Sequence, residues 1–193
     1  LKQTYPRSEY LSSRVLRSFS IGESQLVTQL SDLIDQQTNP TIAPYAKVNE
    51  VTLRLTAQAP DEMQGQRLLD DLTATIKARV GDYLYGYGDD NSLAAVVVQT
   101  LIDRQLTITA AESLTAGQFQ STLGSVPGVS AVFPGGFVTY AASAKHDLLG
   151  VSQATIDQDG VVSAATAKEM ASRSRERLDT DFSLSFTGVA GPA

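Results

Sequence analysis

The 193-residue sequence predicts an α/β protein with two domains: a small domain of order β-α-β-α, then an α/β/α sandwich with a largely parallel sheet. Three observations predict it. Apolar and polar residues alternate along two segments of the first half, as in half-buried strands. In the second half, short apolar runs alternate with helical segments, which is typical of parallel strands joined by crossover helices. Between the halves lies a stretch rich in glycine and tyrosine, residues 81–90, where we place a boundary between domains 1–85 and 86–193.

The first domain is expected to contain two strands and two helices. Leu26, Leu30 and Ile34 fall four residues apart and therefore share one helical face. Pro60 and the acidic residues after it suit a first helical turn, where the backbone N–H groups are unpaired and the dipole is positive. The predicted elements are strands at 13–21 and 50–57, helices at 23–36 and 60–80, and a loop at 40–49.

The second domain is expected to alternate helices with strands. Asn91 and Ser163 are good helix caps, and Gly150 and Gly160 are suited to helix ends. The predicted helices cover residues 91–105, 115–123, 144–149, 152–159 and 163–178, and the predicted strands lie at 106–111, within 131–140 and at 181–186.

Composition excludes several functional classes. The chain has no cysteine and one histidine, His146, so thiolate chemistry and multi-histidine metal sites are impossible within it. The net charge is −6, and residues 1–90 and 91–193 each carry −3 (nine basic against twelve acidic residues, and six against nine). Nucleic-acid binders usually have a basic face, so we expect no nucleic-acid partner. No apolar run approaches the roughly 20 residues that span a bilayer, and we expect a cytoplasmic protein.

The first candidate for chemistry is the segment 109–117, where a strand meets a helix. Free N–H groups at a helix start bind phosphate, and Ser113 and Thr115 add hydroxyl donors beside Gly117. Glu112 either holds a ribose hydroxyl or structures the loop. The alternative is that Ser113 merely caps the next helix and Glu112 lies on the surface.

The second candidate is the segment 128–145. A serine such as Ser130 needs a base, and His146 directly follows Lys145, so on a helix it points elsewhere. A serine–lysine pair is the known alternative, and lysine acts as a base only when burial or a nearby cation lowers its pKa. Tyr140 ends a predicted strand and Lys145 begins a helix, so both could reach one crevice. The alternative is that Lys145 is an ordinary solvated lysine.

The third candidate is the segment 186–192, a run of small residues after the last predicted strand. In a parallel sheet, loops at the carboxyl ends of the strands form the ligand crevice. We therefore expect the segments 112–115 and 187–191 to lie at the same edge; the alternative is an ordinary turn.

Together, the three segments resemble the signature of the CinA carboxy-terminal amidase domain. They supply a Glu-Ser-Xaa-Thr-small-Gly turn, a Gly-Gly-Phe-Val-Thr-Tyr strand followed by Lys145, and Thr-Gly-Xaa-Ala-Gly-Pro. Residues 22–24 and 39–47, with the strand at 50–57, are similar to the KH-type middle region of that family. The resemblance covers nearly the whole chain. It implies a small KH-like domain before an amidase domain whose sheet continues beyond residue 193, so the fragment is expected to be inactive or to be completed by a partner chain.

The resemblance also implies an activity, the conversion of nicotinamide mononucleotide to nicotinate mononucleotide and ammonia. In such amidases a serine ten residues before the motif tyrosine is the nucleophile, and a lysine five residues after it is the base. These positions correspond to Ser130, Tyr140 and Lys145, with Tyr140 holding the pair in line. No metal or cofactor is implied. The implied substrate-binding residues are Glu112, Ser113, Thr115, Gly117, Thr187, Gly188, Ala190 and Gly191.

Two other functions compete with the amidase. One is a non-catalytic nucleotide-binding or scaffold module of a competence- or damage-inducible protein. The other is nucleic-acid binding by the KH-like half, which the acidic charge and the lack of a Gly-Xaa-Xaa-Gly loop between helices disfavour. For the intact site we expect a small-molecule nucleotide as substrate, a homo-oligomer, and no membrane partner.

Overall fold

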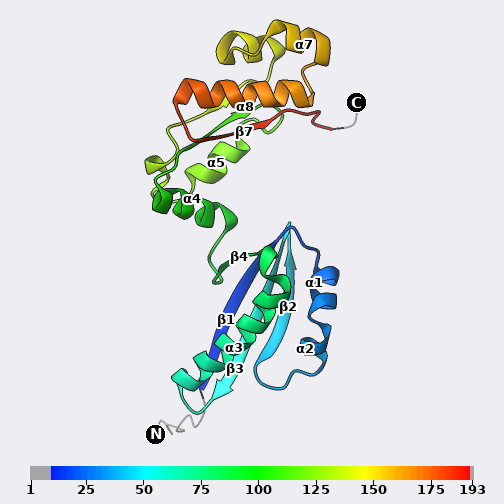
Figure 1. Cartoon of the computed structure of the whole chain (residues 1–193), viewed down its shortest axis with the longest axis vertical. Coiled ribbons are helices and arrows are strands. Elements are labelled where there is room, and N and C mark those ends of the chain that lie inside the picture. Colours follow the sequence, from blue (N-terminus) through cyan, green and yellow to red (C-terminus); the bar gives the residue numbers. More distant parts are fainter. Residues whose placement is uncertain (1–9, 192–193) are drawn as a thin grey trace, which may run out of the picture. The chain divides into compact units, whose positions relative to one another are not determined.

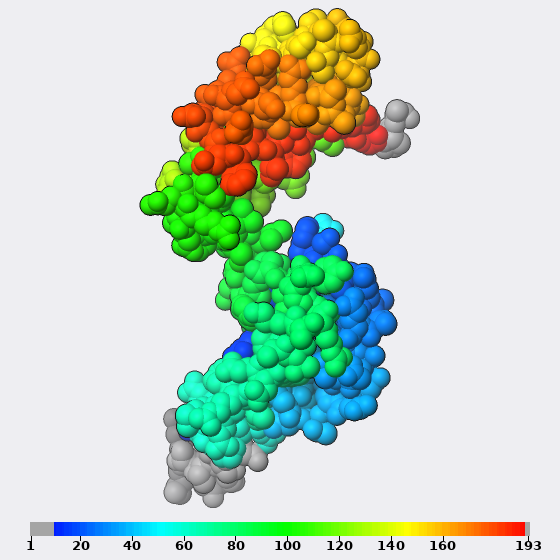
Figure 2. Space-filling view, in the orientation of Figure 1, coloured from blue at the N-terminus to red at the C-terminus, as the bar shows by residue number. Residues whose placement is uncertain are grey.

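The computed structural model describes residues 10–191, and these form two compact units. One unit ends at Leu93 and the other begins at Ala94, so each is built from a continuous stretch of chain (Figure 2). The first contains an antiparallel sheet and the second a parallel sheet, which confirms the predicted mixed α/β class.

The first unit is a four-stranded antiparallel sheet of order β2-β3-β1-β4, and helix α3 lies along one of its faces (Figure 1). Its core contains Leu16 and Leu53, which are paired across β1 and β3, with Leu69 and Ile76 of α3. Its elements are β1 (Tyr10–Phe19), α1 (Glu23–Gln29), α2 (Ser31–Asp35), β2 (Thr41–Lys47), β3 (Glu50–Ala59), α3 (Glu62–Val80) and β4 (Leu84–Tyr87).

Three segments of the first unit differ from the prediction. The helix expected at 23–36 is divided at Leu30 into α1 and α2. Residues 41–47, expected as a loop, form the edge strand β2, where Pro44 is tolerated because an edge strand leaves one side without ladder bonds. Residues 84–87, expected in the boundary stretch, form β4 instead. There the Tyr85 hydroxyl donates to Glu50 (2.7 Å), so this tyrosine packs within its own unit.

The second unit is a three-stranded parallel sheet of order β6-β5-β7 within the described residues. Helix α8 lies on one face, and α4 and α5 lie on the other (Figure 1). The elements are α4 (Leu93–Arg104), β5 (Ile108–Glu112), α5 (Gln118–Gly124), β6 (Phe137–Val138), α6 (Ala142–Ala144), a π-helical turn (Lys145–Leu149), α7 (Gln153–Asp159), α8 (Ala164–Leu178) and β7 (Phe182–Phe186).

Side chains of the central strand β5 alternate between the two faces. Ile108 packs with residues of α4 and α5, whereas Ala111 packs with Met170 of α8. All five residues of β5 are buried, so its last residue, Glu112, enters the interior and Ser113 follows immediately at the carboxyl edge of the sheet. Among residues 10–191, no helix has both the length and the apolar character needed to cross a bilayer.

Candidate active site

The carboxyl edge of the parallel sheet brings two of the predicted loops together. The Ser113 amide donates to the Phe186 carbonyl at 2.8 Å, and the Thr139 amide donates to the Glu112 carbonyl at 2.8 Å. Gly188 lies so close to Leu114 that an added Cβ would be 3.1 Å from its side chain. The ends of β5, β6 and β7 therefore hold Ser113 between two neighbouring strands.

Lys145 is the most unusual residue at this edge, because its side chain is only 2% exposed. It is the first residue of the π-helical turn, a local geometry often found at functional sites. Its Nζ donates to the Ser113 hydroxyl at 2.9 Å, to the Thr139 carbonyl at 2.9 Å and to the Tyr140 carbonyl at 3.2 Å. The described part of the chain places no carboxylate in an ion pair with Lys145.

These three partners suit a neutral amine as well as a charged one. Two are carbonyls, which only accept, and the third is a hydroxyl, which can also donate. An uncharged amine has two N–H groups for the carbonyls and one lone pair for the hydroxyl. Burial disfavours the charged form and lowers the pKa of Lys145 from its ordinary 10.5. The arrangement can therefore take a proton from Ser113.

Ser113 is nearly buried and lies in a tight turn. Its hydroxyl is 3.4 Å from the Tyr140 carbonyl in addition to its contact with Lys145. The next two backbone amides, those of Leu114 and Thr115, donate to no acceptor within residues 10–191. A hydroxyl beside a buried amine and two free N–H groups is the donor set that acyl-transfer chemistry requires.

Glu112 does not lie on the surface: it is fully buried. Its carboxylate accepts hydrogen bonds from the amides of Gly117 (3.0 Å), Phe119 (3.2 Å) and Gln120 (2.9 Å) at the start of α5. Burial alone would raise the pKa of this carboxyl, but hydrogen bonds from the Thr115 hydroxyl, and then from Gln120 and Phe119, hold the pKa below its ordinary value. The carboxylate is thus ionised and fully engaged within the protein.

Within one chain, the structure does not bring Ser130 next to Lys145, the pairing that the resemblance implied. Ser130 is exposed on a 3-10 turn, Val129–Ala131. The carbonyl of the adjoining Val132 accepts from the amide of Ile108, the first residue of β5, so this turn lies at the amino end of β5. Lys145 lies at the carboxyl end, where its partner is Ser113.

The position of Tyr140 also differs from the expectation. Its backbone carbonyl accepts from Lys145, but its side chain is 62% exposed and no hydrogen bond of the phenol is found within the described residues. The phenol therefore does not hold the serine–lysine pair in line. Tyr140 and Lys145 are brought together only through the Tyr140 backbone carbonyl, which accepts from the Lys145 amine.

The predicted phosphate contacts at the start of α5 are corrected as well. The amides of Gly117, Phe119 and Gln120 are occupied by Glu112, and the Ala116 amide donates to the Ser113 carbonyl. The Glu112 carboxylate is likewise out of reach of a ribose hydroxyl. The Thr115 hydroxyl is buried beside the Glu112 carboxylate and helps to lower the pKa of that carboxyl.

The third predicted segment contributes mainly to structure. The Thr187 hydroxyl donates to the Val161 carbonyl at 2.8 Å, and Gly188 packs on Leu114. Ala190 and Gly191 are exposed, while Pro192 lies outside the described residues.

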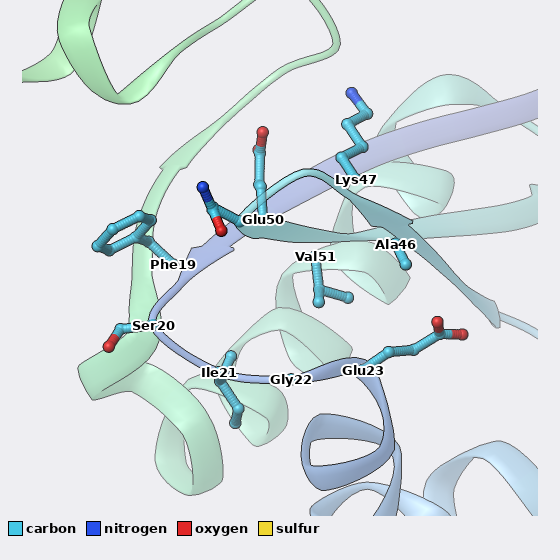
Figure 3. Close-up of a pocket in the computed structure, with 10 residues that line it drawn as sticks. Phe19, Ser20, Ile21, Gly22, Glu23, Ala46, Lys47, Glu50 and Val51 are labelled. Atoms are coloured by element: carbon cyan, nitrogen blue, oxygen red, sulfur yellow. The ribbon is translucent and has the colours of Figure 1, made fainter. Parts of the chain in front are cut away.

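A separate hollow of about 390 Å³ lies in the first unit, between the start of α1 and the β2–β3 turn. Figure 3 shows that Val51 and Ala46 point toward the segment Ile21–Glu23, whereas Lys47 and Glu50 point to the other side of the strands. Their charged groups do not converge in this hollow, so we place the candidate site at Ser113 and Lys145.

The sequence contains a signal for Ser113. Ser113 directly follows the carboxyl end of a strand, the usual place for reactive groups in parallel sheets. The family resemblance implies Ser130 as nucleophile and Ser113 as a substrate-binding residue, whereas the geometry of the sheet favours Ser113 as nucleophile.

Comparisons with known proteins match both units to domains of the CinA family. A family model described as the CinA C-terminal domain matches residues 90–193, and a model described as the damage-inducible protein CinA KH domain matches residues 13–86. A competence-damage inducible protein of Levilactobacillus brevis is 99% identical over 192 residues. The corresponding protein of Lactiplantibacillus plantarum is 59% identical. The chain spans 46% of the length of each relative.

Solved structures resemble part of the chain. A CinA superfamily protein from Escherichia coli has a TM-score of 0.51 at 39% identity, covering 52% of this chain and 58% of the other. A competence/damage inducible protein from Agrobacterium tumefaciens gives a TM-score of 0.51 at 39% identity, covering 52% and 61% respectively.

Proposed function

Because the chain belongs to the CinA family, we propose that its second unit carries a serine–lysine amidohydrolase centre, in which Ser113 is the nucleophile and Lys145 is the base. The observation that supports this most strongly is the 2.9 Å contact between the Lys145 amine and the Ser113 hydroxyl. The amine is buried and has no carboxylate partner among the described residues, so its neutral, basic form is accessible.

The proposed reaction has two halves. Neutral Lys145 accepts the proton of Ser113 while the serine oxygen attacks the carboxamide carbon, giving a tetrahedral oxyanion. The free amides of Leu114 and Thr115 are the groups that would stabilise this oxyanion, each worth about 3 kcal/mol in comparable sites. Lys145 then passes the proton to the carboxamide nitrogen, which leaves as ammonia. The acyl group stays on Ser113 as an ester.

Water completes the cycle. It attacks the ester carbon while Lys145 accepts one of its protons, and the Ser113 oxygen leaves and recovers that proton. The balance is one carboxamide plus one water giving one carboxylic acid plus one ammonia. No redox change occurs, and the chain's own residues supply every proton transfer.

We propose nicotinamide mononucleotide as the substrate, following the resemblance described above. Its positively charged pyridinium ring withdraws electrons from the carboxamide and makes the carbon more electrophilic. The net charge of −6 does not oppose the approach of a cationic ring. The helix-start amides occupied by Glu112 are unavailable to the phosphate, so other groups must bind it.

The test is ammonia release from nicotinamide mononucleotide by the full-length Levilactobacillus brevis relative, with the equivalents of Ser113→Ala and Ser130→Ala. We expect the first variant to lose turnover by at least about 10³-fold, because the nucleophile is gone. We expect the second to keep it, because Ser130 is exposed at the other end of β5. Full activity of Ser113→Ala would refute the proposal, and nucleotide binding without ammonia release would favour the non-catalytic module.

A further inference from the structure

Glu112 and Ser113 are consecutive residues that point to opposite faces of the sheet. The Glu112 carboxylate reaches the start of α5, whereas the Ser113 hydroxyl reaches Lys145 in the π-helical turn. The peptide group between them is fixed on both sides, since its carbonyl accepts from Thr139 and its amide donates to Phe186, both at 2.8 Å. A shift in the backbone of Glu112 would therefore also move Ser113.

The turn that follows Ser113 has an unusual backbone. Ala116 has φ 49° and Gly117 has φ 97°, so two successive residues lie in the left-handed region, which is unfavourable for alanine. Three hydrogen bonds to the buried Glu112 carboxylate fasten the residues directly after this turn. Hydrogen bonds to an ionised carboxylate are roughly twice as strong as bonds between neutral groups.

The backbone amides around this turn fall into two groups. The Glu112 carboxylate takes the N–H groups of Gly117, Phe119 and Gln120, whereas those of Leu114 and Thr115 have no acceptor among the described residues. The carboxylate also keeps its negative charge on the α5 side, away from Lys145, where an ion pair would stabilise the ammonium form.

We propose that Glu112 is a positioning residue of this centre: its carboxylate holds the turn at residues 113–120 so that the Ser113 hydroxyl faces Lys145 and the Leu114 and Thr115 amides face the substrate. This inference rests on the proposed function of Ser113. It assigns Glu112 a role in the rate of acylation and none in substrate contact.

The experiment compares Glu112→Gln with Glu169→Gln in the full-length Levilactobacillus brevis relative. Glu169 is a matched control, because its carboxylate also accepts a backbone amide, that of Ser152 at 2.9 Å, but it serves α7 instead of the site. Two rates are measured: turnover of nicotinamide mononucleotide, and covalent labelling of Ser113 by a small fluorophosphonate, detected by peptide mass spectrometry. Thermal unfolding is recorded for every variant.

We expect Glu112→Gln to lower both kcat and the labelling rate by about 100-fold, the usual penalty for a small misplacement of reacting groups. KM should change less than about threefold, because no substrate contact is lost. Glu169→Gln should leave both rates unchanged. Glu112→Asp keeps the charge but shortens its reach by one methylene; it is the second variant if the glutamine variant does not fold, and its labelling rate should also fall.

Three results would overturn the inference. The first is equal labelling of Ser113 in wild type and Glu112→Gln. The second is a rise in KM with unchanged kcat, which would return Glu112 to substrate binding. The third is absence of Ser113 labelling in wild type, since no activated hydroxyl would then exist. Labelling of wild type that depends on Glu112, without any ammonia release, would retain the positioning role and refute only the proposed substrate.

Discussion

Replacing Lys145 by methionine should separate activity from stability. Methionine has nearly the same length as lysine and cannot accept a proton. The substitution removes three hydrogen bonds, each worth about 1 kcal/mol net. It also removes the cost of burying an amine that can be charged, which is several kcal/mol for a fully charged group. These effects oppose each other, so we expect the free energy of unfolding to change by less than about 2 kcal/mol, while kcat falls by about 10²–10⁴-fold.

The assay pairs ammonia release with urea unfolding, both on the full-length relative. Lys168→Met is the matched control, because Lys168 is exposed on α8 in the same unit and should affect neither measurement. Retention of more than about a tenth of the wild-type kcat in Lys145→Met would refute the role of Lys145 as base. A loss of stability large enough to unfold the protein would refute the reasoning about the opposing terms.

Three further predictions follow from the geometry. First, kcat should rise as the pH passes through the pKa of Lys145, which lies below 10.5, because only the neutral amine is a base. The free energy of unfolding should rise between that pKa and 10.5, because in this range the unfolded chain binds more protons than the folded one. Second, Gly136→Ala should destabilise the second unit by about 1–3 kcal/mol, because the new Cβ would lie 2.6 Å from the Ala110 carbonyl oxygen and 2.6 Å from the Gln120 side-chain oxygen. Third, Arg17→Ala should destabilise the first unit by about 1–3 kcal/mol, because it removes the hydrogen bonds of a buried guanidinium to the part-buried Tyr85 and Glu50, and kcat should not change.

Each of these has a clear contrary outcome. A kcat that stays constant from neutral pH to pH 10 would mean that Lys145 does not titrate as proposed. For the two stability variants, urea unfolding curves that match wild type would contradict the packing and hydrogen-bond assignments. A fall in kcat for Arg17→Ala without any loss of stability would show that the first unit contributes to turnover.

Periodicity predicted the second unit well because its elements are strongly patterned. The predicted helix at 163–178 corresponds to α8, capped by Ser163, whose hydroxyl accepts from the Thr166 amide. The strand at 181–186 corresponds to β7. Short elements were harder to predict. β2 contains Pro44, and the four-residue strand β4 contains Gly86, both unfavourable in strands, so pairing with β3 and β1 is needed to stabilise them.

The candidate site, too, could be predicted only in part from the sequence. That the strand ends converge follows from parallel topology, so the approach of the segments 112–115 and 187–191 could be predicted, whereas the contact of Lys145 with Ser113 was not. The choice between Ser113 and Ser130 could not be made from spacing, because it depends on which end of β5 each serine occupies. The direction of the Glu112 side chain depends on the left-handed turn at Ala116 and Gly117, which no sequence pattern specified.

The most direct test of the central claim is to trap the covalent intermediate. Acid quenching of the full-length relative during turnover of nicotinamide mononucleotide, followed by peptide mass spectrometry, locates any ester. We predict an acyl group on the peptide that contains Ser113, formed in wild type and absent from Ser113→Ala. An acyl group on Ser130, or turnover of Ser113→Ala at the wild-type rate, would contradict the account.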